Sequence, residues 1–166
     1  MVKGPKGELV ETLNSEIAAE IKDGFIQLSL KNQSRELSAI YGTSRARLYN
    51  MICGVSFGFT KILDIVGLGY KAEATGQKLT LSLGKSHPVL FEIPKGISAV
   101  VDAKKTQVTL SGANKEHIGE IAAKLRSLRP PEPYKGTGIR YHGEHVRKKA
   151  GKTAAGVGAG AGGAKK

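Results

Sequence analysis

Side chains suited to catalysis or metal binding are few and scattered along this 166-residue chain, which has four histidines and one cysteine. His142 and His145 stand three positions apart, but the surrounding Lys and Arg residues would repel a cation. His87 lies in a turn, and the sequence pairs it with no carboxylate or nucleophile. Cys53 sits in an apolar run, which is typical of a buried and inert thiol. We therefore expect no enzyme, no metal and no cofactor.

Phosphate recognition is far better represented, and it is concentrated near the C-terminal end. Residues 124–166 hold 11 basic and 2 acidic residues, a net of +9, whereas residues 1–123 hold 15 and 12, a net of +3. Lys and Arg neutralise phosphates and release counterions, and Tyr134 and Tyr141 can stack on unpaired bases. The excess charge favours nucleic acid over an acidic membrane surface as the partner. A tail that only increases solubility is the simpler alternative.

The segment from residue 129 to residue 152, called the arm below, predicts an extended backbone. Pro130, Pro131 and Pro133 exclude a helix, since proline has no N–H to donate and disfavours helical geometry in the residue before it. The arm has few apolar residues for a core, so we expect it to become ordered only on a partner. Residues 153–166 are rich in Gly and Ala and predict a flexible tail.

The remaining chain predicts an α+β body that carries the arm. Helical spacing of apolar residues predicts a helix from Arg35 to Ile52, interrupted near Gly42, and a second from Asn114 to Arg126 with Asn114 as its N-cap. No run approaches the roughly 20 apolar residues that a membrane-spanning helix needs. Alternating apolar and polar residues predict strands at residues 25–30, 59–67, 69–74, 78–83 and 106–110.

The two halves of the body share one pattern of turns and apolar residues. A shift of 80 positions superposes them without a gap, and examples are Gly4 on Gly84, Ile17 on Ile97 and Leu30 on Leu110. This pattern predicts two tandem copies of a small antiparallel sheet covered by one helix, followed by the basic extended tail. The expected boundaries are 1–56 and 57–128 for the repeats, 129–152 for the arm and 153–166 for the tail. In the first copy, either the initial strands are missing or the sheet is smaller.

Several motifs carry a resemblance to a known family. The arm reads Arg129-Pro130-Pro131-Glu132-Pro133-Tyr134-Lys135-Gly136-Thr137-Gly138-Ile139-Arg140-Tyr141, which resembles the C-terminal signature of the bacterial-type large-subunit ribosomal protein six family. Supporting motifs begin at Val2-Lys3-Gly4-Pro5, Asn50-Met51-Ile52, Val66-Gly67-Leu68-Gly69 and Leu83-Gly84-Lys85-Ser86. Together they cover residues 2 to 152.

The resemblance implies a structural protein of the large ribosomal subunit. It implies binding to large-subunit rRNA near the sarcin–ricin loop and the stalk base, with neighbouring ribosomal proteins and translation factors close by, and with neither membrane nor small-molecule substrate. The expected location is a ribosome in the bacterial cytoplasm or in an organelle such as a plastid. The residues expected to contact rRNA are Lys85, Ser86 and His87 in one turn and, in the arm, Arg129, Tyr134, Lys135, Arg140, Tyr141, Arg147, Lys148, Lys149 and Lys152.

Two features depart from the family pattern, and two other function classes stay open. Thr137 stands where the family usually has a second Lys, so one phosphate contact is in doubt. The residues that usually precede the Val2 motif are absent, which puts the first strands in doubt. The competing hypotheses are a free-standing regulator that binds RNA or DNA outside the ribosome and an enzyme that uses His87 or His145.

Overall fold

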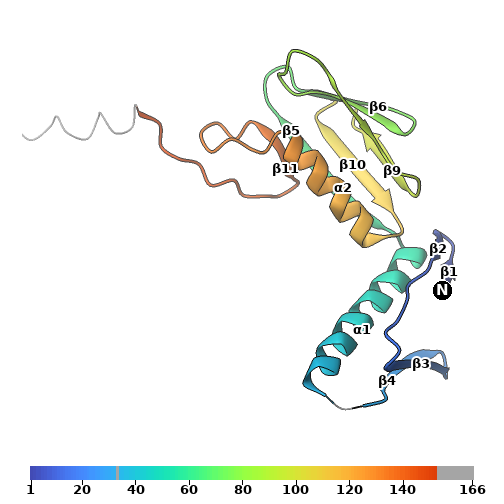
Figure 1. Cartoon of the computed structure of the whole chain (residues 1–166). Helices are drawn as coiled ribbons and strands as arrows, with labels where there is room; N and C mark the ends of the chain where they lie inside the picture. Colours follow the sequence, from blue (N-terminus) through green and yellow to red (C-terminus); the bar gives the residue numbers. More distant parts are fainter. Residues whose placement is uncertain (33, 153–166) are drawn as a thin grey trace, which may run out of the picture. The chain divides into compact units, whose positions relative to one another are not determined.

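The computed structural model of the chain describes residues 1–32 and 34–152 and shows an α+β protein (Figure 1). The tail predicted at residues 153–166 lies outside the described residues. The elements in chain order are β1 (Val2–Gly4), β2 (Gly7–Leu9), β3 (Ile17–Lys22), β4 (Phe25–Leu30), α1 (Arg35–Ser56), β5 (Phe59–Val66), β6 (Lys71–Thr75), β7 (Lys78–Ser82), β8 (Val89–Glu92), β9 (Ile97–Val101), β10 (Gln107–Gly112), α2 (Lys115–Leu128) and β11 (Gly138–Tyr141).

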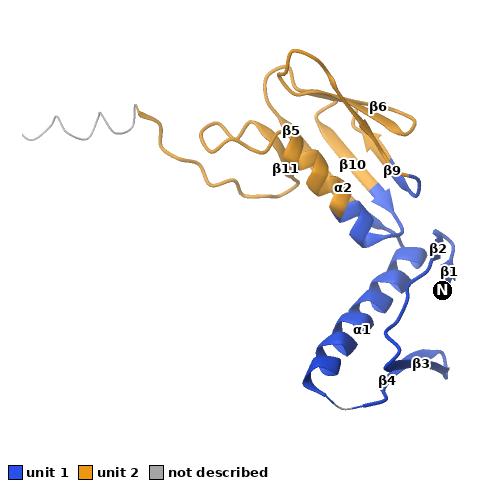
Figure 2. Cartoon of the chain, in the orientation of Figure 1, with its two compact units in different colours: residues 1–60, 95–98, 111–119 blue, residues 61–94, 99–110, 120–166 orange. Residues whose placement is uncertain are grey.

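The chain forms two compact units (Figure 2). Unit 1 contains residues 1–60, 95–98 and 111–119, and unit 2 contains the rest of the described chain. The strands are ordered β1-β2, β3-β4, β6-β7-β8 and β11-β5-β10-β9 in their sheets. Strands β5, β9 and β10 and helix α2 each contribute residues to both units.

The predicted repetition is visible in where the elements begin. Strand β9 begins 80 positions after β3 (97 − 17), and helix α2 begins 80 positions after α1 (115 − 35). In both halves a strand pair precedes the helix, β3 and β4 before α1 and β9 and β10 before α2. The predicted fold class, tandem sheet–helix copies of α+β type, is confirmed. The predicted boundaries at residues 56, 128 and 152 stay a prediction.

Strands β3 and β4 form a hairpin with its turn at Asp23 and Gly24, and the alternation at residues 25–30 predicted only the second of these strands. Both turn residues have positive φ, 52° and 79°, as a two-residue hairpin turn of this kind requires. The pairing runs from Ile17 opposite Leu30 to Lys22 opposite Phe25. Little of this hairpin is buried, because Phe25 at its tip is 77% exposed and Ile17 at its base is its one buried apolar residue among those described.

Helix α1 is continuous from Arg35 to Ser56, so the interruption predicted near Gly42 is wrong. The Oγ of Ser34 accepts a hydrogen bond from the Leu37 N–H and caps the helix. At the predicted break, the Thr43 hydroxyl donates to the carbonyl of Ala39 one turn earlier and stays within the helical pattern. An interior glycine costs only about 1 kcal/mol, which the flanking helical turns offset.

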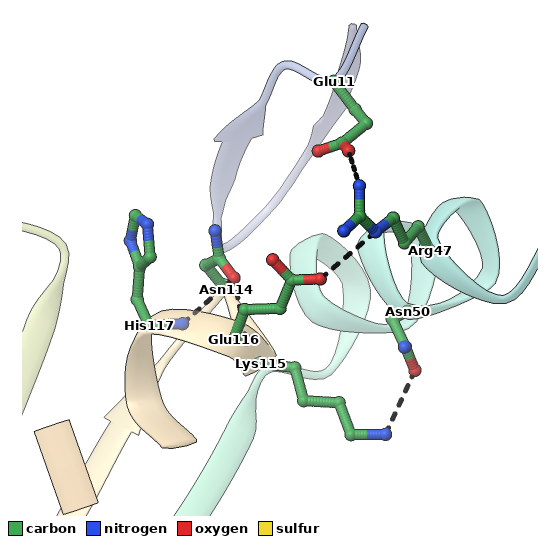
Figure 3. Close-up of polar contacts among 7 residues, drawn as sticks. All are labelled: Glu11, Arg47, Asn50, Asn114, Lys115, Glu116 and His117. Carbon is green, nitrogen blue, oxygen red and sulfur yellow. Dashed lines mark hydrogen bonds and ion pairs between the residues drawn. The ribbon is translucent and has the colours of Figure 1, made fainter. Parts of the chain in front are cut away.

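A polar network joins helix α1 to the first turn of helix α2 in unit 1 (Figure 3). The Arg47 guanidinium pairs with Glu11 at 3.0 Å and with Glu116 at 3.5 Å. The ammonium of Lys115 donates to the amide oxygen of Asn50 at 3.2 Å. These side chains are largely exposed, so the network orients the helices more than it stabilises them.

The predicted N-cap of helix α2 is confirmed in the same place. Asn114 Oδ1 accepts hydrogen bonds from the backbone N–H groups of Glu116 and His117, at 2.9 and 3.3 Å. The apolar residues whose spacing predicted this helix include Ile118, Ile121, Ala122 and Leu125, and all four are buried. Local capping and apolar spacing therefore sufficed to place this helix.

The core of unit 2 draws on β5, β7, β10, α2 and β11. Its buried side chains include Leu63, Ile65, Leu79, Leu81, Val108, Leu125 and Ile139. Ile139 belongs to the arm and is 1% exposed, and its strand β11 pairs antiparallel with β5 from Gly138 opposite Val66 to Tyr141 opposite Leu63. The expectation that the arm lacks packing of its own is therefore wrong for this part, because one isoleucine and one free strand edge suffice to dock it.

Candidate nucleic-acid interface

The predicted contact residues lie in two segments of unit 2. Lys85, Ser86 and His87 form the loop between β7 and β8, and all three are exposed. The others follow the end of helix α2 at Leu128 and continue past β11 to residue 152. The contacts that hold the arm, described next, do not involve the loop.

The arm leaves helix α2 at Arg129 and turns back through a compact bend. The N–H of Glu132 donates to the Thr137 carbonyl, and the N–H of Gly136 donates to the Glu132 carbonyl, both at 2.9 Å. The Thr137 hydroxyl donates to the Glu132 carboxylate at 2.9 Å. Thr137, where the family pattern has a Lys, thus stabilises the bend that displays Tyr134 and Lys135.

Glycine is needed where the arm enters β11. Gly138 has φ of +140°, and a Cβ there would lie 2.6 Å from the Pro130 carbonyl oxygen. The N–H of Ile139 then donates to the Arg129 carbonyl at 2.8 Å, which joins the start of the arm to β11. Any larger residue at position 138 would separate them.

The far end of β11 is fixed by Glu144 and Arg126. The two side chains form a bidentate ion pair, at 2.6 and 3.2 Å, and Glu144 also accepts the backbone N–H of Tyr141 at 3.0 Å. The hydrogen bond from Arg126 lowers the pKa of Glu144 below its ordinary value, and the backbone hydrogen bond adds to this effect. The same hydrogen bond raises the pKa of Arg126. The Tyr141 ring lies under both Arg126 and Lys61, at 5.6 and 5.0 Å.

A second carboxylate, Asp64 on β5, stands opposite Arg140 on β11. Desolvation raises the pKa of Asp64, but hydrogen bonds from Gln107 and His142 and the charge of Arg140 outweigh it, so the pKa is lowered overall. The His142 Nδ1 lies 3.1 Å from one oxygen of Asp64. The Arg140 Nε is buried and has no hydrogen-bond partner in the described chain. Arg140 and His142 are thus turned partly toward the body.

After β11 the arm runs back past the bend that its residues 132–137 form. The N–H of Lys149 donates to the Pro133 carbonyl at 2.7 Å, and the Lys148 side chain passes 3.7 Å from the position of a Cβ on Gly136. Tyr134 and Lys135 are therefore brought close to Lys148 and Lys149. This is a cationic surface on a folded support.

In the described chain these cations have no ion pair, whereas seven of the 17 Lys and Arg residues among residues 1–128 do. Ion pairs neutralise Lys3, Lys22, Arg47, Lys78, Lys105, Lys124 and Arg126. In residues 1–32 and 34–152 the ion pairs found leave Lys85, Lys135, Arg147, Lys148 and Lys149 without a carboxylate partner. Unpaired exposed cations on a fixed scaffold are suited to phosphate binding.

The two tyrosines differ in what they offer to a base. Tyr134 is 53% exposed at the bend, whereas the Tyr141 ring is half-buried between cations. Base stacking needs a free ring face, so Tyr134 is the better placed of the two. Stacking at either residue stays a prediction.

Sequence reasoning missed the residues that hold the arm in place. Lys61, Asp64 and Arg126 belong to the body, and their role depends on contacts with arm residues that lie far away in the sequence. Glu144 offered the better signal, because it is one of only two carboxylates among residues 124–166. An acidic residue in so basic a segment indicates an ion pair that supports the structure.

The candidates for catalysis remain dispersed. In the described chain, no three His, Cys, Asp or Glu side chains gather where a metal ion could be held. Cys53 is free and half-buried, so it is more exposed than its apolar surroundings predict. No helix in the described part of the chain is long and apolar enough to cross a membrane.

Comparison with known proteins identifies the family. The family model "Ribosomal protein L6" matches residues 66–142, which include β11 and the loop after β7. Proteins named "Large ribosomal subunit protein uL6" from three bacteria are similar to this chain over 152 residues. They come from Listeria monocytogenes serotype 4a, Enterococcus faecalis and Halalkalibacterium halodurans and are 54%, 51% and 49% identical to this chain. Each alignment covers 92% of this chain and 85% of the relative. The chain therefore belongs to the ribosomal protein L6 family.

Proposed function

We propose that this chain is a non-catalytic constituent of the large ribosomal subunit that binds large-subunit rRNA through the arm and the Lys85–Ser86–His87 loop. The contact lies near the sarcin–ricin loop and the stalk base, where it supports the site of the translation factors. The names of the relatives support the coarse assignment. The family resemblance supports the finer location.

One observation carries the rRNA contact, namely a run of exposed cations without an ion pair to any described residue, on a part of the arm that is anchored to the body. Arg147, Lys148 and Lys149 follow one another on a segment anchored by β11 and by the Lys149 N–H. Charges held at fixed positions neutralise phosphates without first losing the entropy of a disordered tail. The proposal also places the particle in a bacterium or an organelle and sets the boundaries of the repeats at residues 56 and 128.

The test measures how salt affects binding of the full chain to an rRNA fragment that contains the sarcin–ricin loop. Replacing Arg147, Lys148 and Lys149 by Gln should weaken binding and lower the slope of log K against log salt by about 0.7–0.9 for each lost phosphate contact. A matched control replaces Lys3, Lys22 and Lys78, which are paired with carboxylates in the body, and removes the same charge. Equal slopes for the two variants would refute the role of the arm.

A sedimentation experiment separates the ribosomal function from a free-standing regulator. The ribosomal assignment requires the chain to migrate with large subunits at low salt and to dissociate as salt rises. A chain found mainly in the soluble fraction at low salt would support the regulator.

A further inference from the structure

Two loops of unit 2 meet at a single aromatic ring. The β5–β6 loop contains Gly67 and Gly69, and the β7–β8 loop begins near Gly84; all three glycines have positive φ. A Cβ on Gly67 would lie 2.7 Å from the ring of Tyr70, and a Cβ on Gly84 would lie 2.9 Å from it. The ring therefore occupies the space that side chains at both glycines would need, and it sets the spacing between the loops.

The loops braced in this way expose an aliphatic side chain beside cations. Leu68, between the two glycines, is 102% exposed. A single exposed leucine is common at protein surfaces. Here, however, the Tyr70 N–H donates to the Gly67 carbonyl at 3.3 Å and the ring fills the loop, so Leu68 is held away from the body. A fully exposed apolar side chain on a braced loop is suited to contact with a partner.

The charge around Leu68 indicates the class of partner. Residues 67–71 and 84–88 contain Lys71, Lys85 and His87 and no carboxylate. Glu73 on β6 is paired with Lys105 and also interacts with the charge of Lys71. Two cations, a hydroxyl and an aliphatic tip match an RNA helix, whose shallow minor groove displays ribose edges and 2′-hydroxyls between rows of phosphate.

We propose that residues 67–71 and 84–87 form one composite rRNA-contact surface, on which Leu68 packs against ribose and base edges. In this surface Lys71 and Lys85 meet phosphates, and Tyr70 is a positioning residue that fixes the distance between the loops. The proposal rests on the proposed function and extends the contact to Leu68, Lys71 and Tyr70.

The test uses the full chain, the same rRNA fragment and hydroxyl-radical footprinting of the ribose backbone. Leu68→Ala should weaken binding about tenfold without changing the salt slope, because it removes an apolar contact. Lys71→Gln should lower the slope by about 0.7–0.9. Both should remove one patch of ribose protection and leave the arm's patch in place. Leu90→Ala, at an apolar residue of β8 that is also exposed, is the matched control and should bind normally.

The positioning role of Tyr70 is tested by comparing two variants. Tyr70→Ala should lose the same patch as Leu68→Ala, and Tyr70→Phe should keep it, because the ring and not the hydroxyl spaces the loops. If Tyr70→Ala fails to fold, the Leu68→Ala result still decides the proposal, since Leu68 makes no packing contact that folding could need.

Two results would overturn the inference. One is wild-type affinity and a complete footprint for Leu68→Ala. The other is normal binding of Leu68→Ala to the rRNA fragment with loss of the protein from whole large subunits during a salt wash, which would assign Leu68 to a protein neighbour. In either case an arm variant with a reduced salt slope would show that the proposed function itself stands.

Discussion

At the scale of single residues, Glu144 accepts hydrogen bonds from Arg126 and from the Tyr141 N–H, and its pKa is lowered. A carboxylate with a lowered pKa stabilises the folded state above its unfolded pKa of about 4.3, and this contribution is lost as the pH falls through the folded value. We expect the end of β11 to stay docked from pH 8 to pH 5 and to loosen below about pH 4. The Tyr141 amide shift in a two-dimensional NMR titration measures this directly.

The control for this titration is Glu144→Gln. It should abolish the acidic transition at Tyr141 and destabilise the docked strand at neutral pH by about 1–2 kcal/mol, because a charge-assisted hydrogen bond is replaced by a neutral one. Asp64 also has a lowered pKa, so the amide of Arg140, which stands opposite Asp64 in the sheet, should keep an acidic transition in this variant. A Tyr141 midpoint above the ordinary value for Glu would contradict the assignment.

Gly138 is the residue whose replacement should release the arm. Gly138→Ala combines a positive φ with a Cβ 2.6 Å from the Pro130 carbonyl oxygen, so we expect a loss of about 2–3 kcal/mol in the free energy of unfolding. Gly143→Ala is the matched control, because Gly143 also has positive φ but no atom within 4 Å of its Cβ position. It should cost about 1 kcal/mol. Urea denaturation of both variants tests the difference, and equal losses would exclude a role for the close approach.

At the scale of elements, helix α1 contains two glycines whose replacement by alanine should have opposite effects on stability. A Cβ on Gly54 would lie 2.0 Å from the Ala113 carbonyl oxygen, whereas Gly42 has no neighbour within 4 Å. Gly54→Ala should therefore destabilise unit 1 by at least about 2 kcal/mol, because the backbone at Ala113 must move. Gly42→Ala should stabilise the helix by up to about 1 kcal/mol. Helix content during thermal unfolding distinguishes them, and a stabilised Gly54→Ala would show that the helix does not pack closely there.

The elements that local signals specify are those that the sequence predicted well. Asn114 caps α2, and alternation over residues 25–30 marks β4, because each signal lies within a few neighbouring residues. Strand β11 was missed for the opposite reason. Its four residues include Gly138 and Arg140 and bury mainly Ile139, so no alternation is visible. Its place depends on the free edge of β5, more than 70 residues earlier.

The candidate site divides in the same way. Charge counting located the arm and its cations, since net charge is a property of the sequence itself. It could not show that Arg126 and Asp64 would hold the arm, because those contacts exist only after the sheet has formed. Nor could it separate exposed Tyr134 from half-buried Tyr141, which differ only in their three-dimensional neighbours.

At the scale of the whole molecule, the β3–β4 hairpin before α1 buries far fewer apolar side chains than the β6-β7-β8 sheet after β5. The β3–β4 hairpin buries only Ile17 among its described apolar residues, and Ile21 is 80% exposed. The β6-β7-β8 sheet buries Ala72, Leu79 and Leu81 completely or nearly so. Apolar burial of roughly 25 cal/mol per Å² is the main source of stability, so the two regions should open with different free energies.

We therefore expect hydrogen exchange to divide the chain into two tiers. Amides of residues 17–30 should exchange through local opening that is nearly independent of urea, whereas those of residues 71–83 should exchange only through an opening whose free energy falls steeply with urea. Leu79→Ala should lower protection throughout the second region by about 2–4 kcal/mol, and Phe25→Ala should leave both regions within about 0.5 kcal/mol. Exchange with one common free energy for both regions would contradict this division, because it would require the exposed hairpin to unfold only together with the buried core.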